Sequence, residues 1–425
     1  MLKTLLKNSL LRATGIYTIT SIINSAIPFL LLPILTRYLT PEDYGIVSMF
    51  TLLITFVSPF TGLSINGAIS RQYYNKDEVD IWKYVFNCFL ILITSTLFVS
   101  IIFFIFSKMI SDLASFPSSY LWLVIVYSFS QFVVSIVLSL WQVQKKALRY
   151  GIFVNGQTLL NGVLSIAFVV SLNFGWKGRI YGQTIAVLVF AGFAIITLFK
   201  NKWITFSFNK KYILNALNFG VPLIPHALSG SIISMTDRVF ITGMVGLAAT
   251  GVYTVGYQVG SIINILAMSF NNAYIPWLYE RLEKNDNTTK IKIVKFTYLY
   301  FVLIIFLAIV LGMIAPYALK IFLGESFNNS SIYVIWIALG YAFNGMYLMV
   351  VNYIFYAQKT KYLAMVTFFT AILNIILNYY FIKANGAIGA AQATTIIFLI
   401  KFLIVWILSD KVQRMPWNLI RQKIV

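Results

Sequence analysis

The sequence predicts an all-α integral membrane protein with about twelve transmembrane helices, arranged as two six-helix lobes around a central cavity. The prediction rests on the composition, the apolar runs and an internal repeat. Of the 425 residues, 60% are hydrophobic and 10% are charged, whereas about a quarter of the residues of an average soluble domain are charged. A mean hydropathy of +0.84 agrees with this contrast. Folding in water would leave too much apolar surface exposed.

The apolar runs give the predicted helices in order. A spanning helix needs roughly 20 mostly apolar residues, and the chain contains a series of such runs separated by short polar breaks. Because lipid offers no partners to backbone polar groups, chains cross it as helices or as closed barrels, and runs of this length exclude a barrel. We predict spans at about 13–36, 43–69, 82–106, 119–141, 151–173, 180–199, 213–241, 247–274, 296–319, 331–357, 362–382 and 386–409.

The basic residues predict the orientation of these spans. If both termini are cytoplasmic, Lys and Arg concentrate in the inside loops, as the positive-inside rule requires. Lys3, Lys7 and Arg12 precede the first apolar run, which is too long for a signal peptide and lacks a small-x-small cleavage site, so we expect a retained span. The net charge of +20 is then a topology signal, and we predict no nucleic-acid partner.

Few residues could support catalysis or bind a metal. The single cysteine, Cys88, permits no intramolecular disulfide and no thiolate cluster. With one histidine and few carboxylates inside the spans, no catalytic triad or zinc motif can be assembled, and no Walker A sequence is present. We therefore predict no metal, no cofactor and no enzymatic activity.

The two halves of the chain resemble each other. We predict an N-terminal lobe at 1–199, a basic cytoplasmic linker at 200–212, a C-terminal lobe at 213–409 and a basic cytoplasmic tail at 410–425. Gly45–Ser48 and Gly251–Thr254 begin the second span of each half. An even number of spans per copy gives a parallel repeat, related by an axis along the membrane normal, and such symmetry is commonly used for alternating access.

Polar residues recur every three or four positions on one face of the second and eighth spans, and at the repeat offset the two stripes coincide. We interpret them as lining a water-accessible cavity. The alternative is that they hydrogen-bond neighbouring helices. The predicted cavity-lining residues are Thr51, Thr55, Ser58 and Asn66 in the first half and Tyr257, Ser261, Asn264 and Asn271 in the second.

Two segments carry a family resemblance. Pro28–Gly45 resembles the first helix and following loop of the polysaccharide transporters that include the Wzx-type O-antigen flippases, in the multidrug/oligosaccharidyl-lipid/polysaccharide superfamily. Phe219–Ile241 is similar to the seventh helix of that family. The resemblance implies a flippase that moves undecaprenyl-pyrophosphate-linked oligosaccharide, a repeat unit of O-antigen or a related surface polysaccharide such as lipopolysaccharide, from the cytoplasmic to the periplasmic leaflet of a bacterial inner membrane.

The resemblance also implies partners. These are the lipid-linked oligosaccharide, membrane lipids, polysaccharide assembly proteins, and H+ or Na+ as a coupling ion. A pyrophosphate is a strong anion, and basic side chains in a low-dielectric cavity attract it. The substrate-binding candidates are Lys401, Arg37, Arg238, Asp237, Arg71 and Arg149.

Lys401 is the most informative candidate. It interrupts the last apolar run about 12 Å from its inner end, where a charge costs roughly 2.5 to 3.5 kcal/mol on insertion scales. The alternative is a lysine that extends to the interface. For Asp237 and Arg238 the alternative is an interfacial charge pair, and topology alone explains Arg71 and Arg149.

Asp237 and His226 are the candidates for ion coupling. The pKa of histidine is ordinarily close to physiological pH, which suits a proton carrier. The alternative for His226 is a hydrogen-bonded packing residue.

Three other functions compete with a flippase. A small-molecule or drug cation antiporter of the same superfamily should present buried carboxylates, whereas most candidates here are cationic. A membrane glycosyltransferase or polymerase needs positioned catalytic groups, usually on sizeable external loops, and the connections here are short. A channel or scaffold would be the third, and no pore-ring pattern supports it.

Overall fold

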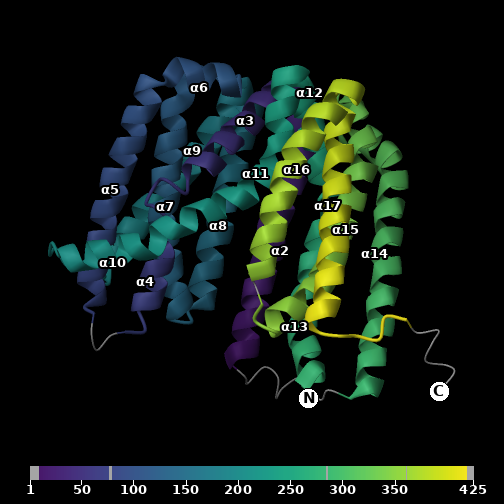
Figure 1. Cartoon of the computed structure of the whole chain (residues 1–425). Coiled ribbons are helices and arrows are strands. Elements are labelled where there is room, and N and C mark those ends of the chain that lie inside the picture. The colour runs from purple at the N-terminus through teal and green to yellow at the C-terminus, as the bar shows by residue number, and fades with distance from the viewer. Residues whose placement is uncertain (1–8, 76–78, 284–285, 360, 419–425) are drawn as a thin grey trace. The chain divides into compact units, whose positions relative to one another are not determined.

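The computed structural model describes residues 9–75, 79–283, 286–359 and 361–418, and every regular element among them is a helix (Figure 1). The α-helices are α2 (Ser9–Tyr38), α3 (Pro41–Val57), α4 (Asn66–Gln72), α5 (Ile81–Ile105), α6 (Ser107–Ala114), α7 (Leu121–Val143), α8 (Ala147–Ile166), α9 (Gly175–Lys200), α10 (Lys210–Gly220), α11 (Ile224–Met244), α12 (Leu247–Gly260), α13 (Ile262–Glu283), α14 (Asn287–Phe322), α15 (Ser331–Tyr356), α16 (Lys361–Asn385) and α17 (Ala387–Val412).

The chain divides into two compact units. Unit 1 comprises Met1–Met235 and unit 2 comprises Thr236–Val425. The boundary lies inside α11, and α10 packs on α4 and α5 of unit 1. The predicted lobe bounds of 1–199 and 213–409 stay a prediction.

Nine helical segments of the described chain are long and apolar enough to cross a bilayer, and each overlaps a predicted span. They are Gly15–Tyr38, Ile81–Ile105, Ser118–Val143, Ala147–Ser171, Gly175–Lys200, Asn287–Phe322, Glu325–Tyr356, Met365–Asn385 and Ala387–Val412. The all-helical membrane fold is therefore confirmed.

Each of the three remaining predicted spans is interrupted in the structure. The run at 43–69 is divided into α3 and α4, and the run at 213–241 is divided by a 3-10 turn at Val221–Leu223. Proline lacks an N–H and its ring clashes with the preceding turn, which explains breaks next to Pro59 and Pro222. The run at 247–274 is divided after Gly260, where a built Cβ would lie 2.7 Å from Cβ of Ile337.

One helix lies at the centre of each unit. In unit 1, α7 contacts α3, α4, α5 and α9, and in unit 2, α15 contacts α12, α13, α14 and α17. Figure 1 shows α14, α15 and α17 running alongside one another. The segments that contain α7 and α15 are the most buried of the nine apolar segments. They coincide with the fourth and tenth predicted spans, which is the same position in each copy of the predicted repeat.

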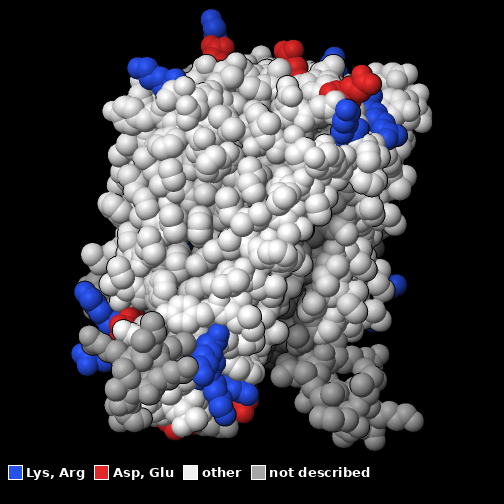
Figure 2. Space-filling view, turned by 90° about the vertical axis from the view of Figure 1, so that its right-hand side faces the viewer, with Lys and Arg blue, Asp and Glu red and all other residues white. Residues whose placement is uncertain are grey.

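The surface suits a lipid environment. On the face in Figure 2, charged side chains gather toward the two ends and leave a broad uncharged band between them. In unit 1 an apolar groove of about 1130 Å³ is lined by residues of α3, α5, α6 and α10. Such a surface would be costly in water and is stable against hydrocarbon.

The break between α3 and α4 depends on Gly62. Its φ is +75°, and Leu63 and Ser64 also have positive φ. The Gly62 N–H donates to Ser95 Oγ over 2.9 Å. A Cβ atom added to Gly62 would lie only 2.5 Å from Cε2 of Phe132. Only glycine fits both the backbone conformation and this close ring contact.

We expect Gly62→Ala to lower the free energy of unfolding by about 2 kcal/mol or more, from the positive φ and the ring contact together. Gly192→Ala is the control, since Gly192 lies inside α9 with nothing within 4 Å of a built Cβ, and alanine is the better helix former. Thermal unfolding in detergent measures both. Equal stability of the wild type and Gly62→Ala would contradict this account of the break.

Candidate functional site

Asp237 and Arg238 form a buried charge pair in unit 2, on the last turns of α11. Arg238 Nη1 lies 3.5 Å from Asp237 Oδ1, and the Arg238 backbone N–H donates to the same oxygen over 2.8 Å. The exposed fractions of the two residues are 2% for Asp237 and 7% for Arg238. Among the described residues, Asp237 and Arg238 are the charged residues that are buried. Burying two charges side by side has a high desolvation cost.

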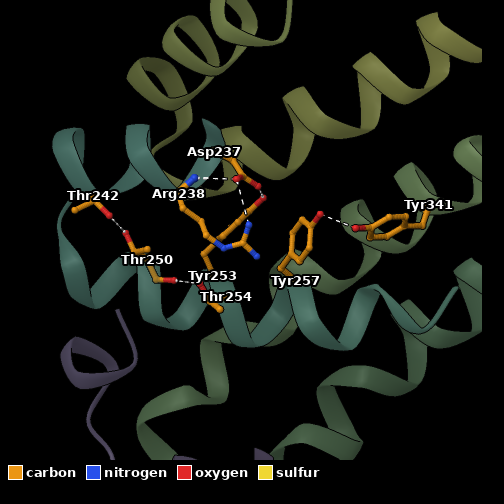
Figure 3. Close-up of polar contacts among 8 residues, drawn as sticks. All are labelled: Asp237, Arg238, Thr242, Thr250, Tyr253, Thr254, Tyr257 and Tyr341. Atoms are coloured by element: carbon orange, nitrogen blue, oxygen red, sulfur yellow. Dashed lines mark hydrogen bonds and ion pairs between the residues drawn. The ribbon is translucent and has the colours of Figure 1, made fainter. Parts of the chain in front are cut away.

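Tyrosines from two further helices surround the pair (Figure 3). Tyr253 of α12 donates its hydroxyl to Asp237 Oδ2. The Arg238 guanidinium carbon lies 4.4 Å from the ring centroid of Tyr257, and the hydroxyls of Tyr257 and Tyr341 are 2.5 Å apart. We call Asp237, Arg238, Tyr253, Tyr257 and Tyr341 the charge–tyrosine cluster.

The cluster offsets the cost of burial through short local bonds. The attraction between two buried charges offsets their desolvation cost only when their geometry is good and their remaining polar atoms are hydrogen-bonded. Asp237 accepts from a phenol, a backbone N–H and a guanidinium, and the guanidinium stacks on an aromatic face, where the attraction is about 2 kcal/mol when desolvated. Carboxylate, guanidinium and phenols at one place can bind an anionic group or transfer a proton.

Lys401 lies in the middle of α17 in unit 2. Its Nζ lies 4.1 Å from the ring centroid of Tyr347 of α15. Lys401 is eleven residues before Val412, where α17 ends, which is about 16 Å along the helix axis. An ammonium at this depth is stabilised by the ring face and remains only partly buried.

In unit 1, the predicted stripe bonds to its own helix. The hydroxyls of Thr51, Thr55 and Ser58 each donate to the carbonyl four residues earlier, over 3.0, 2.7 and 2.7 Å. They are exposed or partly exposed, and Ser58 and Asn66 line a pocket of about 250 Å³. These bonds satisfy the hydroxyls without a second helix.

The stripe of unit 2 does bond to a second helix. Tyr257 reaches Tyr341 of α15, and Asn271 accepts from Asn352 Nδ2 of α15 over 2.9 Å. Ser261 donates to Gln258 O over 2.7 Å, and Asn264 is partly exposed. Helix-to-helix bonding, the alternative given above, thus describes Asn271.

Three predicted arginines are exposed and lie apart from the charge–tyrosine cluster in sequence. Arg37 is in the last turn of α2, and Arg149 is in the first turn of α8. Arg71 of α4 lies with its guanidinium 5.8 Å from the Phe219 ring centroid. The side chain of His226 lies outside the described residues.

The sequence interpretation did not single out Tyr341 or Arg179. Tyr341 has no local signal, because its partner Tyr257 is far away in the chain. Arg179 Nη1 donates to Asn161 Oδ1 over 2.8 Å and to Ser165 Oγ over 2.5 Å.

No group of three or more His, Cys, Asp or Glu side chains suited to a metal ion occurs in the described part of the chain. Cys88 is buried and free. At the charge–tyrosine cluster, the side chains present supply ionic recognition and hydrogen bonding.

Known proteins resemble this chain over most of its length. A family model described as polysaccharide biosynthesis protein matches residues 10–282, and a MatE family model matches residues 222–380. Two proteins of Haemophilus influenzae are each 26% identical: an uncharacterized membrane protein over 92% of both chains, and Lsg locus putative protein 1 over 85% of this chain and 88% of its own.

Solved structures share the fold. The lipid II flippase MurJ in an inward closed conformation gives a TM-score of 0.74 at 17% identity, covering 94% of this chain and 87% of its own. An inward-facing multidrug resistance MATE family transporter of the MOP superfamily gives 0.71 at 16% identity, covering 92% and 94%. These similarities give the chain a MATE/MurJ-like membrane fold.

The matched families consist of transporters, which overturns the glycosyltransferase or polymerase alternative and confirms that the chain is not an enzyme. The polysaccharide biosynthesis model covers well over half of the sequence. The chain therefore belongs to the polysaccharide biosynthesis protein family.

Proposed function

We propose that the protein is a flippase that moves undecaprenyl-pyrophosphate-linked oligosaccharide, a repeat unit of O-antigen or a related surface polysaccharide, from the cytoplasmic to the periplasmic leaflet of a bacterial inner membrane. The lipid tail stays in the bilayer while the sugar crosses by alternating access. No covalent step is needed. Other polysaccharide assembly proteins would supply and receive the substrate.

The observation that carries the proposal is Lys401, an ammonium in the middle of an apolar helix, beside the face of Tyr347. An ionisable residue at membrane depth is rare and usually functional. Little water would compete with a pyrophosphate head group for the Lys401 ammonium. The electrostatic attraction between the two groups would therefore be strong. Family membership makes a sugar-bearing lipid the expected anion.

The charge–tyrosine cluster supplies a second ionic element in unit 2. If the ion pair between Asp237 and Arg238 opened, Arg238 would bind the substrate phosphate. Asp237 would then accept a coupling H+ or Na+. The fold shared with a lipid II flippase supports a substrate with a lipid tail and a polar head.

The second candidate is a drug or metabolite cation antiporter. The MatE match, the MATE-like fold and the buried carboxylate of Asp237 favour it. However, Asp237 is already bonded by Arg238 and Tyr253. An organic cation would have to displace both, so we rank this function second.

Proteoliposomes that contain a fluorescent lipid-linked oligosaccharide test the proposal. We expect the sugar to become accessible to an impermeant lectin in the opposite leaflet faster than in liposomes that contain Lys401→Ala. Efflux of a fluorescent organic cation is measured in parallel. Cation efflux without sugar translocation would favour the antiporter.

The direction of transport depends on the orientation, which we propose from the distribution of basic residues. A periplasmic reporter fused after Lys108 or Lys320 should be active, and one fused after Lys146, Lys210 or Lys290 should be inactive. The opposite pattern in whole cells would reverse the orientation and the direction of flipping.

A further inference from the structure

The break between α3 and α4 borders a small polar pocket that includes Ser58 and Asn66 of the predicted stripe. The pocket has a volume of about 250 Å³ and lies within unit 1. Its lining comes from the break, from the start of α4 and from α7: Ser58, Pro59, Ser64, Asn66, Ser128, Gln131, Phe132 and Ser135.

An irregular backbone inside a membrane protein is unusual. At membrane depth it is tolerated only where it is buried in protein or lines a water-filled cavity, and broken helices often form substrate sites in transporters. Gly62, Leu63 and Ser64 have φ values of +75°, +51° and +55°. Two consecutive left-handed residues other than glycine are costly, so the break is maintained against a strain.

Ser128 gives an independent indication of a ligand. Its side chain is 2% exposed, and its hydroxyl has no hydrogen-bond partner among the described residues. An unbonded buried hydroxyl costs about 1 to 3 kcal/mol. By contrast, Ser58 and Ser135 donate to Ile54 O and Phe132 O over 2.7 Å each, so Ser128 differs from these two serines of the wall.

The lining selects a neutral ligand rich in hydroxyl groups. No Asp, Glu, Lys or Arg lines the pocket, which disfavours an ion. Serine hydroxyls and the amides of Asn66 and Gln131 can each donate and accept, as sugar hydroxyls do. The ring of Phe132 offers an apolar surface. With water occupying ~30 Å³ per molecule, the volume suits one sugar ring and not a whole oligosaccharide.

We propose that this pocket is a carbohydrate subsite that binds a single sugar ring, with the Ser128 hydroxyl as a hydrogen-bonding partner. The inference rests on the proposed function, because it assigns the sugar part of the transported lipid to unit 1. It extends that function by separating sugar recognition from the basic residues of unit 2.

A panel of methyl glycosides of hexoses, 6-deoxyhexoses and N-acetylhexosamines tests the subsite. The measurement is saturation-transfer NMR on the full chain in nanodiscs. We expect at least one glycoside to give a saturable signal, with several-fold weaker binding in Ser128→Ala and no binding in Ser128→Leu, whose side chain fills the pocket. Asn66→Leu, at a partly exposed position, is the second blocking variant if Ser128→Leu does not fold.

Ser100→Leu is the matched control, since Ser100 lies on α5 outside the pocket and donates to Thr96 O over 2.8 Å. It should bind like the wild type. If no glycoside binds, or if binding persists in both blocking variants, the subsite is wrong. Translocation in proteoliposomes tests the flippase proposal separately. If the wild type flips lipid-linked sugar but binds no glycoside, the flippase proposal stands and only the subsite is wrong.

Discussion

Lys401→Ala should abolish translocation of lipid-linked oligosaccharide at normal protein abundance. The variant removes the ammonium that we propose binds pyrophosphate, while the apolar run of α17 becomes more continuous. A lysine at the centre of a span costs roughly 2.5 to 3.5 kcal/mol on insertion scales, so membrane insertion should be unchanged or improved. Loss of transport would then reflect function and not folding. Surface polysaccharide in a flippase-deficient strain and the membrane level of each variant are the measurements.

Two variants calibrate this result. Lys401→Arg should retain much of the transport, since charge and reach are approximately kept. Lys383→Ala should have little effect: Lys383 also lies near a ring, 5.9 Å from the Tyr379 centroid, but it is exposed near the end of α16. Full activity of Lys401→Ala at equal abundance would mean that the proposed cationic site is wrong.

Arg238→Met should cost about 3 to 5 kcal/mol of unfolding free energy, because it leaves the Asp237 carboxylate buried without its cation. The double variant Asp237→Asn/Arg238→Met should lose less than the single one, since a neutral amide is cheaper to bury than a lone charge. Thermal unfolding in detergent provides the comparison. The order of the two variants matters more than the size of either loss.

An exposed arginine gives the baseline for this cycle. Arg37→Met, at the end of α2, should change stability by no more than about 0.5 kcal/mol. If the double variant is as unstable as Arg238→Met or less stable, the charge pair is not the source of the loss, and the packing of the arginine stem on Tyr257 is the better explanation.

The helical membrane fold could be predicted because lipid imposes a simple rule on composition. A segment such as Ile81–Ile105 has to be apolar throughout its length, and the predicted span at 82–106 differs from it by one residue at each end. Breaks were harder to predict. At the break between α3 and α4, the conformation of Gly62 depends on contacts with Ser95 and Phe132, which are distant in sequence.

The candidate site was predictable in part for the same reason. Asp237 and Lys401 stand out because a charge in an apolar run is expensive wherever it points. Their partners do not stand out: Tyr341 and Tyr347 are two of 26 tyrosines, and only tertiary packing places them beside a cation. The bonds of Arg179 are equally invisible in the sequence, because its partners Asn161 and Ser165 belong to α8.

The burial of Asp237 and Arg238 also bears on biosynthesis. Charged side chains disfavour the insertion of a helix into lipid, and α11 is absent from the nine described segments that are apolar enough to span on composition alone. The phenol that bonds Asp237 belongs to α12, which leaves the ribosome later. We therefore expect α11 to remain poorly partitioned into the bilayer until α12 has been made, so that the two helices enter lipid as one hairpin.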